Sequence, residues 1–403
     1  MPKRVFYICS GRSFRSDRLG RKMKDLVKCW RELGYEVEHV CGGDLYPASV
    51  SLEDEIKSTT QYYQKWYRRT PLMGPLVNSY SELRCIRHNR MMLDKLTSLL
   101  EQRRPDVVWE RSSRLATAGL KVAQERGIPY VHEWIDNVVS YSISLFHHKA
   151  VRAEKRKNQE ADYIVVVSNK IKETLVQEGI NRDKILVAFN AVNPEEFQVD
   201  HTKRREYRYK LGIKENEILV GYLGSYAFYH DTARLVLAAD ILRKRQEAAV
   251  KILMVGTGKE YKDTRRLVEE RGLLGSMIMM EPWVPKEAVP KVLSGMDIAV
   301  LPGSTDIICP IKVQEYMALE LATVVPDYSC NREVVTDGQT GMFFEPKGEE
   351  SLAAKLLLLA RDHGLRASLG RNAREEVLRR FTWEQTWGKA LTEVMRRINS
   401  KAR

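Results

Sequence analysis

The sequence contains few cysteines, and those it has are widely spaced. Six cysteines are scattered over 403 residues, at positions 9, 29, 41, 85, 309 and 330, and no two form a Cys-x-x-Cys pair. Disulfide-rich folds and thiolate zinc sites both need clustered cysteines, so the spacing argues against either. We expect free thiols in a reducing cytosol.

Long apolar runs and a secretion signal are also missing. No segment approaches the roughly 18 consecutive apolar residues that span a bilayer. The start of the chain, Met1 to Val5, leads at once into a strand pattern, so we expect no signal peptide and a cytoplasmic location. No strand pattern is followed by Gly-x-Gly-x-x-Gly, which argues against a nicotinamide-dependent dehydrogenase.

Acidic residues are fewer than basic ones. The chain has 53 Asp and Glu against 66 Lys and Arg, a formal net charge of +13. Such a charge suits nucleic acid, an anionic membrane surface or phosphate-bearing ligands. The sequence shows no recognised RNA- or DNA-binding module and no dense basic tail, so we expect no nucleic-acid partner.

The order of apolar and helical patterns predicts two α/β domains. A chain of 403 residues exceeds one ordinary domain, and its short apolar strands alternate with helices as in parallel βαβ units. We expect two Rossmann-like, doubly wound domains facing each other across a cleft, where open α/β sheets bind ligands. Residues 1–192 form the first predicted domain, 193–381 the second, and 382–403 a helix that crosses back to the first.

Ten strands and five helices are predicted from periodicity and end signals. The strands are residues 5–9, 37–41, 107–110, 130–133, 163–167, 218–223, 250–255, 277–280, 298–301 and 323–326. The helices are residues 19–33, 115–126, 169–178, 232–244 and 383–398, the first of them ended by Gly34. Two stretches look irregular: residues 61–90 are basic and aromatic, and residues 193–216 are polar like a linker.

The segment from 298 to 318 carries the clearest functional pattern. An apolar strand runs into a loop, and Pro310 then opens a helix, a position where its missing N–H and fixed φ are favourable. The free N–H groups and the positive dipole end of such a helix favour a phosphate. Glu315 lies about one turn further on, within reach of a ribose. The pattern indicates a nucleotide diphosphate site; the alternative is a helix that only packs in an α/β core.

Six motifs of the second half occur in an order found in a known family. They are residues 223–225 (Leu-Gly-Ser), 254–258 (Met-Val-Gly-Thr-Gly), 283–285 (Trp-Val-Pro), 296–302, 310–318 and 332–341. In this order they resemble the GT-B glycosyltransferases, specifically the retaining family-four type. Residues 190–192 (Asn-Ala-Val) resemble the Asn-Gly-Val that ends the family's first domain. The resemblance covers nearly the whole chain.

The resemblance implies roles for the helix at Pro310 and for the loop before it. Glu315 matches the second glutamate of the family's Glu-x7-Glu motif, which bonds the donor ribose. The first glutamate is absent, because Ile307 stands there; Asp306 or the backbone of Ile307 is left to face the donor sugar. Ile311 and Lys312 are expected to hold the diphosphate by their N–H groups. The Lys312 side chain either neutralises the phosphate or is a solvated helix lysine.

Other parts of the donor site are implied by the glycine motifs. Gly224, Ser225 and Gly256 are expected to line the donor. His230 stands near the lysine that clamps the diphosphate in many relatives; it either donates to phosphate or is a histidine at a helix entry. Val284 is expected to lie against the base.

In the first predicted domain the resemblance is partial. Gly20 matches a glycine that lets the backbone approach the donor phosphates. Its loop, residues 11–20, holds three arginines that either meet an anionic acceptor or are solvated. Ile135 stands about where relatives carry a histidine, so Glu133 and Asp136 are the candidates for contacts to sugar or acceptor. The arginines are Arg12, Arg15 and Arg18.

The resemblance implies transfer from a nucleotide diphosphate sugar with retention at the anomeric carbon. The leaving phosphate is expected to deprotonate the acceptor on the same face. No Asp-x-Asp pair occurs in the implied site motifs, so we expect neither a metal nor another cofactor. Three rivals stay open: a GT-B-shaped phosphorylase, an epimerase, and a non-catalytic nucleotide-binding paralogue, the last because Ile307 and Ile135 replace polar residues.

The acceptor is a glycan, a lipid-linked glycan or a small molecule. Residues 62–69 and a helix over 82–95 mix aromatic and basic side chains. Such surfaces either dock on anionic lipid headgroups, line an acceptor groove, or are solvated. We expect a peripheral enzyme on the cytoplasmic membrane face. The basic residues of that helix are Arg84, Arg87, His88 and Arg90.

Overall fold

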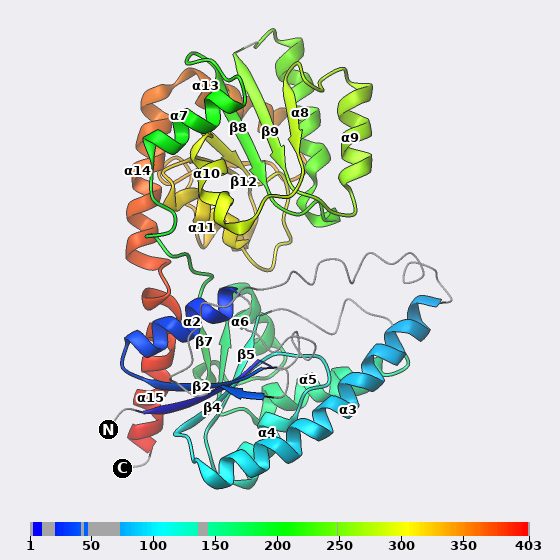
Figure 1. The fold of residues 1–403 in the computed structure, drawn as a ribbon, viewed down its shortest axis with the longest axis vertical. Coiled ribbons are helices and arrows are strands. Elements are labelled where there is room, and N and C mark those ends of the chain that lie inside the picture. Colours follow the sequence, from blue (N-terminus) through cyan, green and yellow to red (C-terminus); the bar gives the residue numbers. More distant parts are fainter. Residues whose placement is uncertain are drawn as a thin grey trace. The chain divides into compact units, whose positions relative to one another are not determined.

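The structure is a computed structural model of the chain. It describes residues 3–9, 21–41, 44–46, 73–135, 144–247 and 249–401. The chain divides into two compact units, each built on its own sheet (Figure 1). Unit 1 comprises Met1–Val167, Ile171–Phe189 and Thr386–Arg403, and unit 2 comprises Ser168–Lys170 and Asn190–Gln385.

Unit 1 contains a seven-stranded sheet in the order β3-β2-β1-β4-β5-β6-β7. All neighbours are parallel except β3, which pairs antiparallel with β2 at the edge. The order in which strands are added to the sheet reverses between β1 and β4, which are parallel neighbours. This is the switch point, where doubly wound sheets bind ligands. The strands are β1 (Arg4–Ile8), β2 (Glu36–Cys41), β3 (Asp44–Tyr46), β4 (Val107–Arg111), β5 (Tyr130–Trp134), β6 (Tyr163–Val166) and β7 (Ile185–Val187).

Two helices of unit 1 differ from the sequence prediction. A helix was expected only over residues 82–95, within and after an irregular stretch 61–90, but the helix α3 (Met73–Gln102) is 30 residues long. Buried Met92, Leu96 and Leu100 anchor that helix, so tertiary packing decides its structure. Helix α5 (His147–Glu160) was not predicted, because its sequence is mostly charged. The other helices are α2 (Arg21–Glu32), α4 (Ala118–Glu125), α6 (Asn169–Gln177), the 3₁₀ turn η3 (Arg182–Lys184) and α15 (Lys389–Lys401).

Two aromatic side chains hold the C-terminal segment to the rest of unit 1. A π-helical turn, η6 (Glu384–Gly388), precedes α15. The indole N–H of Trp387 donates to the Phe189 carbonyl at 3.0 Å. The indole N–H of Trp30, on α2, donates to the Trp387 carbonyl at 3.0 Å. Both indoles are buried, so the segment is part of the core of unit 1.

Unit 2 contains a six-stranded, fully parallel sheet in the order β10-β9-β8-β11-β12-β13. Its switch point lies between β8 and β11. The loops that follow these two strands therefore meet at one edge of the sheet, and they carry the predicted donor motifs. The strands are β8 (Ile218–Leu223), β9 (Val250–Val255), β10 (Ile278–Glu281), β11 (Ile298–Val300), β12 (Ala322–Pro326) and β13 (Met342–Phe344).

The segment that was expected to be a linker contains a helix of unit 2. Within residues 193–216, α7 (His201–Lys210) is capped by Asp200, whose carboxylate accepts from the N–H groups of Thr202 and Lys203. Its few apolar residues hid it from a periodicity search. The other helices are η4 (Phe228–His230), α8 (Thr232–Lys244), α9 (Tyr261–Glu270), η5 (Lys286–Ala288), α10 (Val289–Ser294), α11 (Ile311–Ala318), α12 (Ser329–Arg332), α13 (Glu349–Arg361) and α14 (His363–Arg380).

Two further findings concern the described residues only. None of the five cysteines described, at positions 9, 29, 85, 309 and 330, forms a disulfide. No helix in the described ranges is long and apolar enough to cross a bilayer. The fold class predicted from the sequence, two doubly wound α/β units, is confirmed.

Candidate functional site

The loops after β8 and β9 pack against each other without side chains between them. Gly224 donates its N–H to the Val255 carbonyl at 3.0 Å, and Gly256 donates to the Glu281 carbonyl at 3.1 Å. A Cβ on Gly256 would lie 1.9 Å from the Gly224 carbonyl oxygen, and Gly256 has φ +137°. Only glycine fits there. These glycines bring bare backbone to the edge of the sheet that follows β8.

The Lys312 side chain reaches this same backbone from helix α11. A Cβ built on Gly224 would lie 2.2 Å from Lys312 Nζ and 2.9 Å from the Tyr222 hydroxyl. The ammonium group therefore occupies the space that a side chain at position 224 would need. Lys312 is only 9% exposed, so it is not the solvated helix lysine that the sequence left as an alternative.

Two acceptors hold the ammonium group in place. Lys312 Nζ lies 3.1 Å from His230 Nε2 and 3.4 Å from the Tyr222 hydroxyl. His230 Nδ1 lies 3.3 Å from the Gly303 carbonyl; a carbonyl only accepts, so the ring proton is on Nδ1 and Nε2 accepts from the lysine. The Tyr222 hydroxyl donates to the Ser225 carbonyl at 2.6 Å, which leaves its oxygen to accept as well.

This geometry changes the role expected for His230. The sequence suggested that its imidazole donates to a phosphate or lies at a helix entry. In the structure His230 is buried, and both ring nitrogens are engaged, one by Gly303 and one by Lys312. Burial and the neighbouring ammonium lower the pKa of His230 to about 3. A neutral His230 thus positions Lys312, and Lys312 supplies the cation.

Lys312 is a buried cation that forms no ion pair with any residue in the described part of the chain. Burial lowers its pKa to about 7, and the attraction of the Glu315 carboxylate partly offsets this. An ammonium has three N–H donors, and two acceptors are present. A buried charge without a counter-ion is costly, so this arrangement is matched to an anionic ligand beside Gly224.

Helix α11 adds backbone donors to the same place. Pro310 is its N-cap, in extended conformation with φ −65° and ψ 143°. The sequence analysis expected Pro310 to be the first residue of the helix, but it is the capping residue before it. The first two helical residues are then Ile311 and Lys312, whose N–H groups have no acceptor within the helix. The Tyr316 hydroxyl donates to the Leu223 carbonyl at 3.2 Å and fixes α11 against the end of β8.

The remaining predicted residues of the donor site lie nearby in the chain but have other contacts. Glu315 is half-buried on α11. Asp306 accepts from the Ser329 hydroxyl at 2.7 Å. The Ile307 carbonyl accepts from the Ser168 hydroxyl at 2.7 Å. Because these two groups are engaged within unit 2, a role of Asp306 or Ile307 toward a donor sugar stays a prediction.

Side chains after β8 and β10 form the exposed rim of this edge. Ser225 is exposed, and Val284 is half-buried beside exposed Trp283. Phe228 and Tyr229 are exposed too, with ring centroids 5.2 Å apart. The contact of Val284 with a base stays a prediction. Sequence reasoning missed Tyr222 and Gly303, because a strand tyrosine and a loop glycine carry no signal of the contact each makes.

The candidates of unit 1 do not form a comparable site. Glu133 is fully buried and accepts from the Trp109 indole at 3.0 Å, the Tyr7 hydroxyl at 3.2 Å and the Arg111 guanidinium. The predicted contact with sugar or acceptor does not fit this position, because three internal donors occupy the carboxylate. Gly20, Asp136, the arginines of loop 11–20 and residues 62–69 lie outside the described residues.

Other buried polar groups of unit 1 are also paired internally. Glu154 forms an ion pair with Lys157 at 2.8 Å and accepts from the Ser112 hydroxyl at 2.8 Å. His132 Nδ1 lies 2.8 Å from the Asn158 side-chain oxygen, and the ring is fully buried. His132 therefore packs inside the unit.

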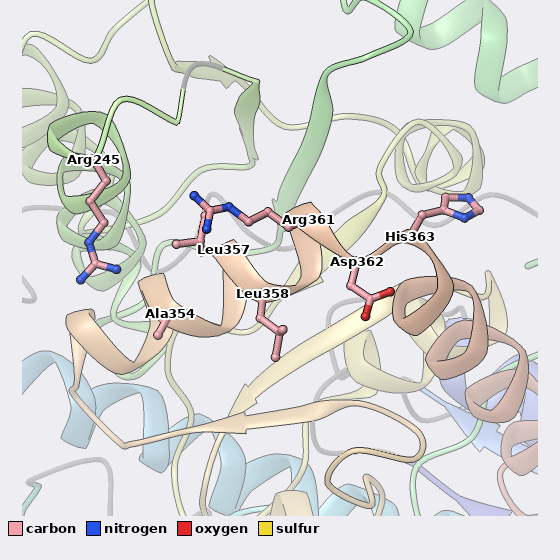
Figure 2. A pocket seen from close by; sticks show the side chains of 7 residues that line it. All are labelled: Arg245, Ala354, Leu357, Leu358, Arg361, Asp362 and His363. Atoms are coloured by element: carbon pink, nitrogen blue, oxygen red, sulfur yellow. The ribbon is translucent and has the colours of Figure 1, made fainter.

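A hollow elsewhere in unit 2 contains none of the predicted residues. It measures about 480 Å³ and lies between the end of α8 and the junction of α13 with α14 (Figure 2). Arg361, on its wall, pairs with Glu247. Since α8 runs back from the edge where β8 ends, this hollow lies at the opposite edge of the sheet. Its lining is Arg245, Ala354, Leu357, Leu358, Arg361, Asp362 and His363.

Comparisons with known proteins match both halves of the chain. Residues 19–191 match the family model of the glycosyl transferase 4-like domain. Residues 203–376 match that of the glycosyl transferases group 1. The chain belongs to the GT-B glycosyltransferases of the family-four type. The family expected from the motifs is thereby confirmed.

The relatives of this glycosyltransferase are distant in sequence. A capsular polysaccharide biosynthesis glycosyltransferase of Staphylococcus aureus is 24% identical over 56% of this chain and 59% of its own. A GDP-mannose-dependent alpha-mannosyltransferase of Mycobacterium tuberculosis is 26% identical over 61% of each chain. The matches span about 60% of the length of the curated relatives.

Solved structures share the fold over a longer stretch. The structure of Anabaena HepE in complex with UDP superposes with a TM-score of 0.71, covering 97% of this chain and 99% of that one, at 15% identity. An identity this low supports the fold alone. The glycosyltransferase fold therefore rests on both sequence and structure, while the chemistry of its site rests on the residues of this chain.

Proposed function

We propose that this glycosyltransferase moves a sugar from a nucleotide diphosphate sugar to a glycan, lipid-linked or small-molecule acceptor, with retention at the anomeric carbon. The observation that carries the proposal is the buried Lys312 ammonium, which has two neutral acceptors and no ion-pair partner among the described residues. A diphosphate would supply the missing counter-charge at the remaining N–H. Charge-assisted hydrogen bonds of this kind contribute about 1.5–3 kcal/mol each.

The surrounding backbone suits the same ligand. The N–H groups of Ile311 and Lys312 begin α11, and the helix dipole there favours an anion. Gly224 and Gly256 leave backbone without side chains at this edge, so phosphates could approach closely. Glu315, about one turn into the helix, would accept from the two hydroxyls of a ribose, because an ionised carboxylate is an acceptor only.

In the proposed reaction the bond between the anomeric carbon and the diphosphate oxygen breaks. The negative charge that develops on the diphosphate would be stabilised by Lys312 and the N–H groups of α11. The acceptor hydroxyl attacks the same face, and its proton passes to an oxygen of the leaving phosphate. A cationic lysine in this place supports catalysis without a metal ion, since it supplies the positive charge itself.

The names of the relatives suggest which base, sugar and acceptor this enzyme uses. One relative is named for GDP-mannose and one structural neighbour contains UDP, so both nucleotides are candidates. The relative named for capsular polysaccharide biosynthesis favours a growing glycan as acceptor. The net charge of +13 fits the expected location at an anionic membrane face on the cytoplasmic side.

Calorimetric binding of UDP, GDP, ADP and TDP to the purified chain, with metal chelated, tests the proposal. We expect one diphosphate to bind selectively. Glu315→Gln should weaken that nucleotide at least tenfold, because a charged acceptor for the ribose is lost. Arg245→Ala is the control; this cation lines the hollow in Figure 2 and should leave binding unchanged. Absence of binding by all four diphosphates to folded protein would overturn the donor site.

A non-catalytic nucleotide-binding protein is the second candidate. It is favoured by Ile307, which replaces the carboxylate expected toward the donor sugar and whose carbonyl is already bonded to Ser168. The two candidates differ in turnover. Once the base is known, the sugar nucleotides of that base can be screened for transfer or slow hydrolysis by release of the diphosphate. Tight binding with no release from any donor would favour the second candidate.

A further inference from the structure

The outer face of the first half of α3 is apolar where it meets solvent. Leu76, Tyr80, Leu83 and Met91 are 62%, 67%, 53% and 42% exposed. Their spacing of four, three and eight residues places them on one stripe of the helix. The opposite side of α3 carries the buried Met92 and packs in unit 1. The N-terminal end of α3 extends beyond the sheet of its unit in Figure 1.

Arginines border and interrupt this stripe, and its one exposed acid, Asp94, lies at the C-terminal end, three residues after Met91. Arg84, Arg87 and Arg90 are exposed, and Arg87 falls on the stripe itself, four residues after Leu83. The only acidic residue between Met73 and Leu93 is Glu82. That carboxylate is buried and bonds to Arg114 and Ser144. The solvent-facing side is therefore apolar and cationic at once.

The stripe continues onto the segment before α5. The backbone N–H of Leu145 donates to the Ser79 hydroxyl of α3 at 2.9 Å, and the Leu145 side chain is 77% exposed. Behind it, Cys85 and Ile86 of α3 pack with Phe146 and Ala150. We call the group Leu76, Tyr80, Leu83, Arg87, Met91 and Leu145 the α3 face. Exposed Lys149 and Arg152 on α5 add two more cations beside it.

We propose that the α3 face docks unit 1 on an anionic lipid bilayer. Its apolar side chains would enter the boundary between headgroups and acyl chains, with the Tyr80 ring at the headgroup level. Its arginines would contact lipid phosphates, each strengthening binding roughly fivefold on an anionic leaflet. None of the residues of the α3 face belongs to the donor site, so docking does not depend on which nucleotide binds there.

The combination of apolar exposure and charge favours a lipid surface over a solvated helix and over a nucleic-acid partner. A solvated helix does not expose four large apolar side chains on one stripe. Binding to nucleic acid depends on phosphate contacts by cations and gains little from Leu76 or Leu83. By contrast, exposed Leu358 of unit 2 stands next to Arg361 and Asp362, which carry opposite charges (Figure 2). Isolated exposure of that kind needs no partner.

Cosedimentation of the full chain with vesicles tests the proposal. We expect binding to vesicles of 30 mol% phosphatidylglycerol in phosphatidylcholine, much weaker binding to pure phosphatidylcholine, and partial release at high salt. Two variants separate the contributions. Leu76→Ser with Tyr80→Ser and Leu83→Ser removes apolar contact, and Arg87→Gln with Arg90→Gln removes charge. Each should weaken binding to the anionic vesicles at least tenfold.

Matched variants on unit 2 serve as controls. Leu358→Ser with Leu378→Ser changes leucines that are 45% and 47% exposed, and Arg245→Gln with Arg371→Gln removes the same charge; neither should alter vesicle binding. Circular dichroism and urea denaturation report whether each variant is folded. If the triple variant does not fold, Tyr80→Ser alone should still weaken binding at least twofold. Unchanged binding by both α3 variants would overturn the proposal. So would loss of binding in the arginine variant alone, since that indicates simple attraction to a polyanion.

Discussion

Three buried carboxylates of unit 1 each have an ion-pair partner inside the protein, as does the buried Asp240 of unit 2, whereas the buried Lys312 of unit 2 has none among the described residues. Glu133 has Arg111, Glu154 has Lys157, and Glu82 has Arg114. Lys312 of unit 2 contacts the neutral His230 and Tyr222 and has no ion-pair partner among the described residues. We interpret the three paired carboxylates as part of the framework of the fold, and Lys312 as part of a ligand site.

The largest effect we expect comes from breaking a paired charge in unit 1. Glu133→Ala would leave the Arg111 guanidinium buried and unpaired, which costs about 3–5 kcal/mol of unfolding free energy. Urea denaturation of the purified variant measures it. The control is Glu125→Ala, since the pair of Glu125 with Lys121 is half exposed and should contribute less than about 1 kcal/mol. Equal losses in the two variants would show that Glu133 is not a framework residue.

Lys312→Met, unlike Glu133→Ala, should weaken ligand binding without lowering the stability of the protein. Replacing a buried cation that has no counter-ion with an apolar side chain of similar length is expected to keep or raise the stability of the ligand-free protein. The same change should weaken nucleotide diphosphate binding by about 10- to 100-fold, because a charge-assisted hydrogen bond is lost. Denaturation and calorimetry on one preparation measure both. A large loss of stability with intact binding would assign Lys312 to the framework and remove the contrast between the units.

The sequence predicts the inner strands of both sheets, because parallel strands such as β8 and β9 are buried apolar runs bounded by glycine. It misses the three-residue edge strands β3, β7 and β13, which are too short to show a pattern. It also indicates where an anion binds, since Pro310 and the Gly224 motif mark the ends of elements. It gives α3 only in part, over residues 82–95, and it misses helices such as α5 and α7, whose packing faces are interrupted by polar residues. It also fails for Glu133, because the three donors that occupy its carboxylate come from β1 and β4. Pairing across a sheet has no local sequence signal.

Substitutions of His230 test how the Lys312 ammonium group is held in place. His230→Ala removes the acceptor at Nε2, so diphosphate binding should weaken about tenfold. Glutamine can both donate to the Gly303 carbonyl and accept from Lys312, so His230→Gln should retain most of the affinity. In a Lys312→Met background, His230→Ala should have no further effect, because it acts through the lysine. Additive losses in the double variant would instead mean that His230 contacts the ligand itself.

The smallest effect, a pH dependence, follows from the same unpaired cation. The pKa of Lys312 is about 7 in the free protein, and a bound diphosphate would raise it, because it favours the charged form. From pH 7 to pH 8 the free protein loses this proton, so affinity should fall about fivefold in calorimetric titrations. Phosphate ionisation is largely complete there, and Lys312→Met should show a nearly flat profile.

The unfolding free energy of the ligand-free protein should rise over the same pH range in which the affinity for the diphosphate falls. An unfolded lysine titrates near pH 10.4, so between pH 7 and that value the unfolded chain binds a proton that the folded chain has released. The contribution of Lys312 to the unfolding free energy therefore rises with pH. A wild-type affinity as flat as that of Lys312→Met would show that the buried ammonium does not meet the ligand.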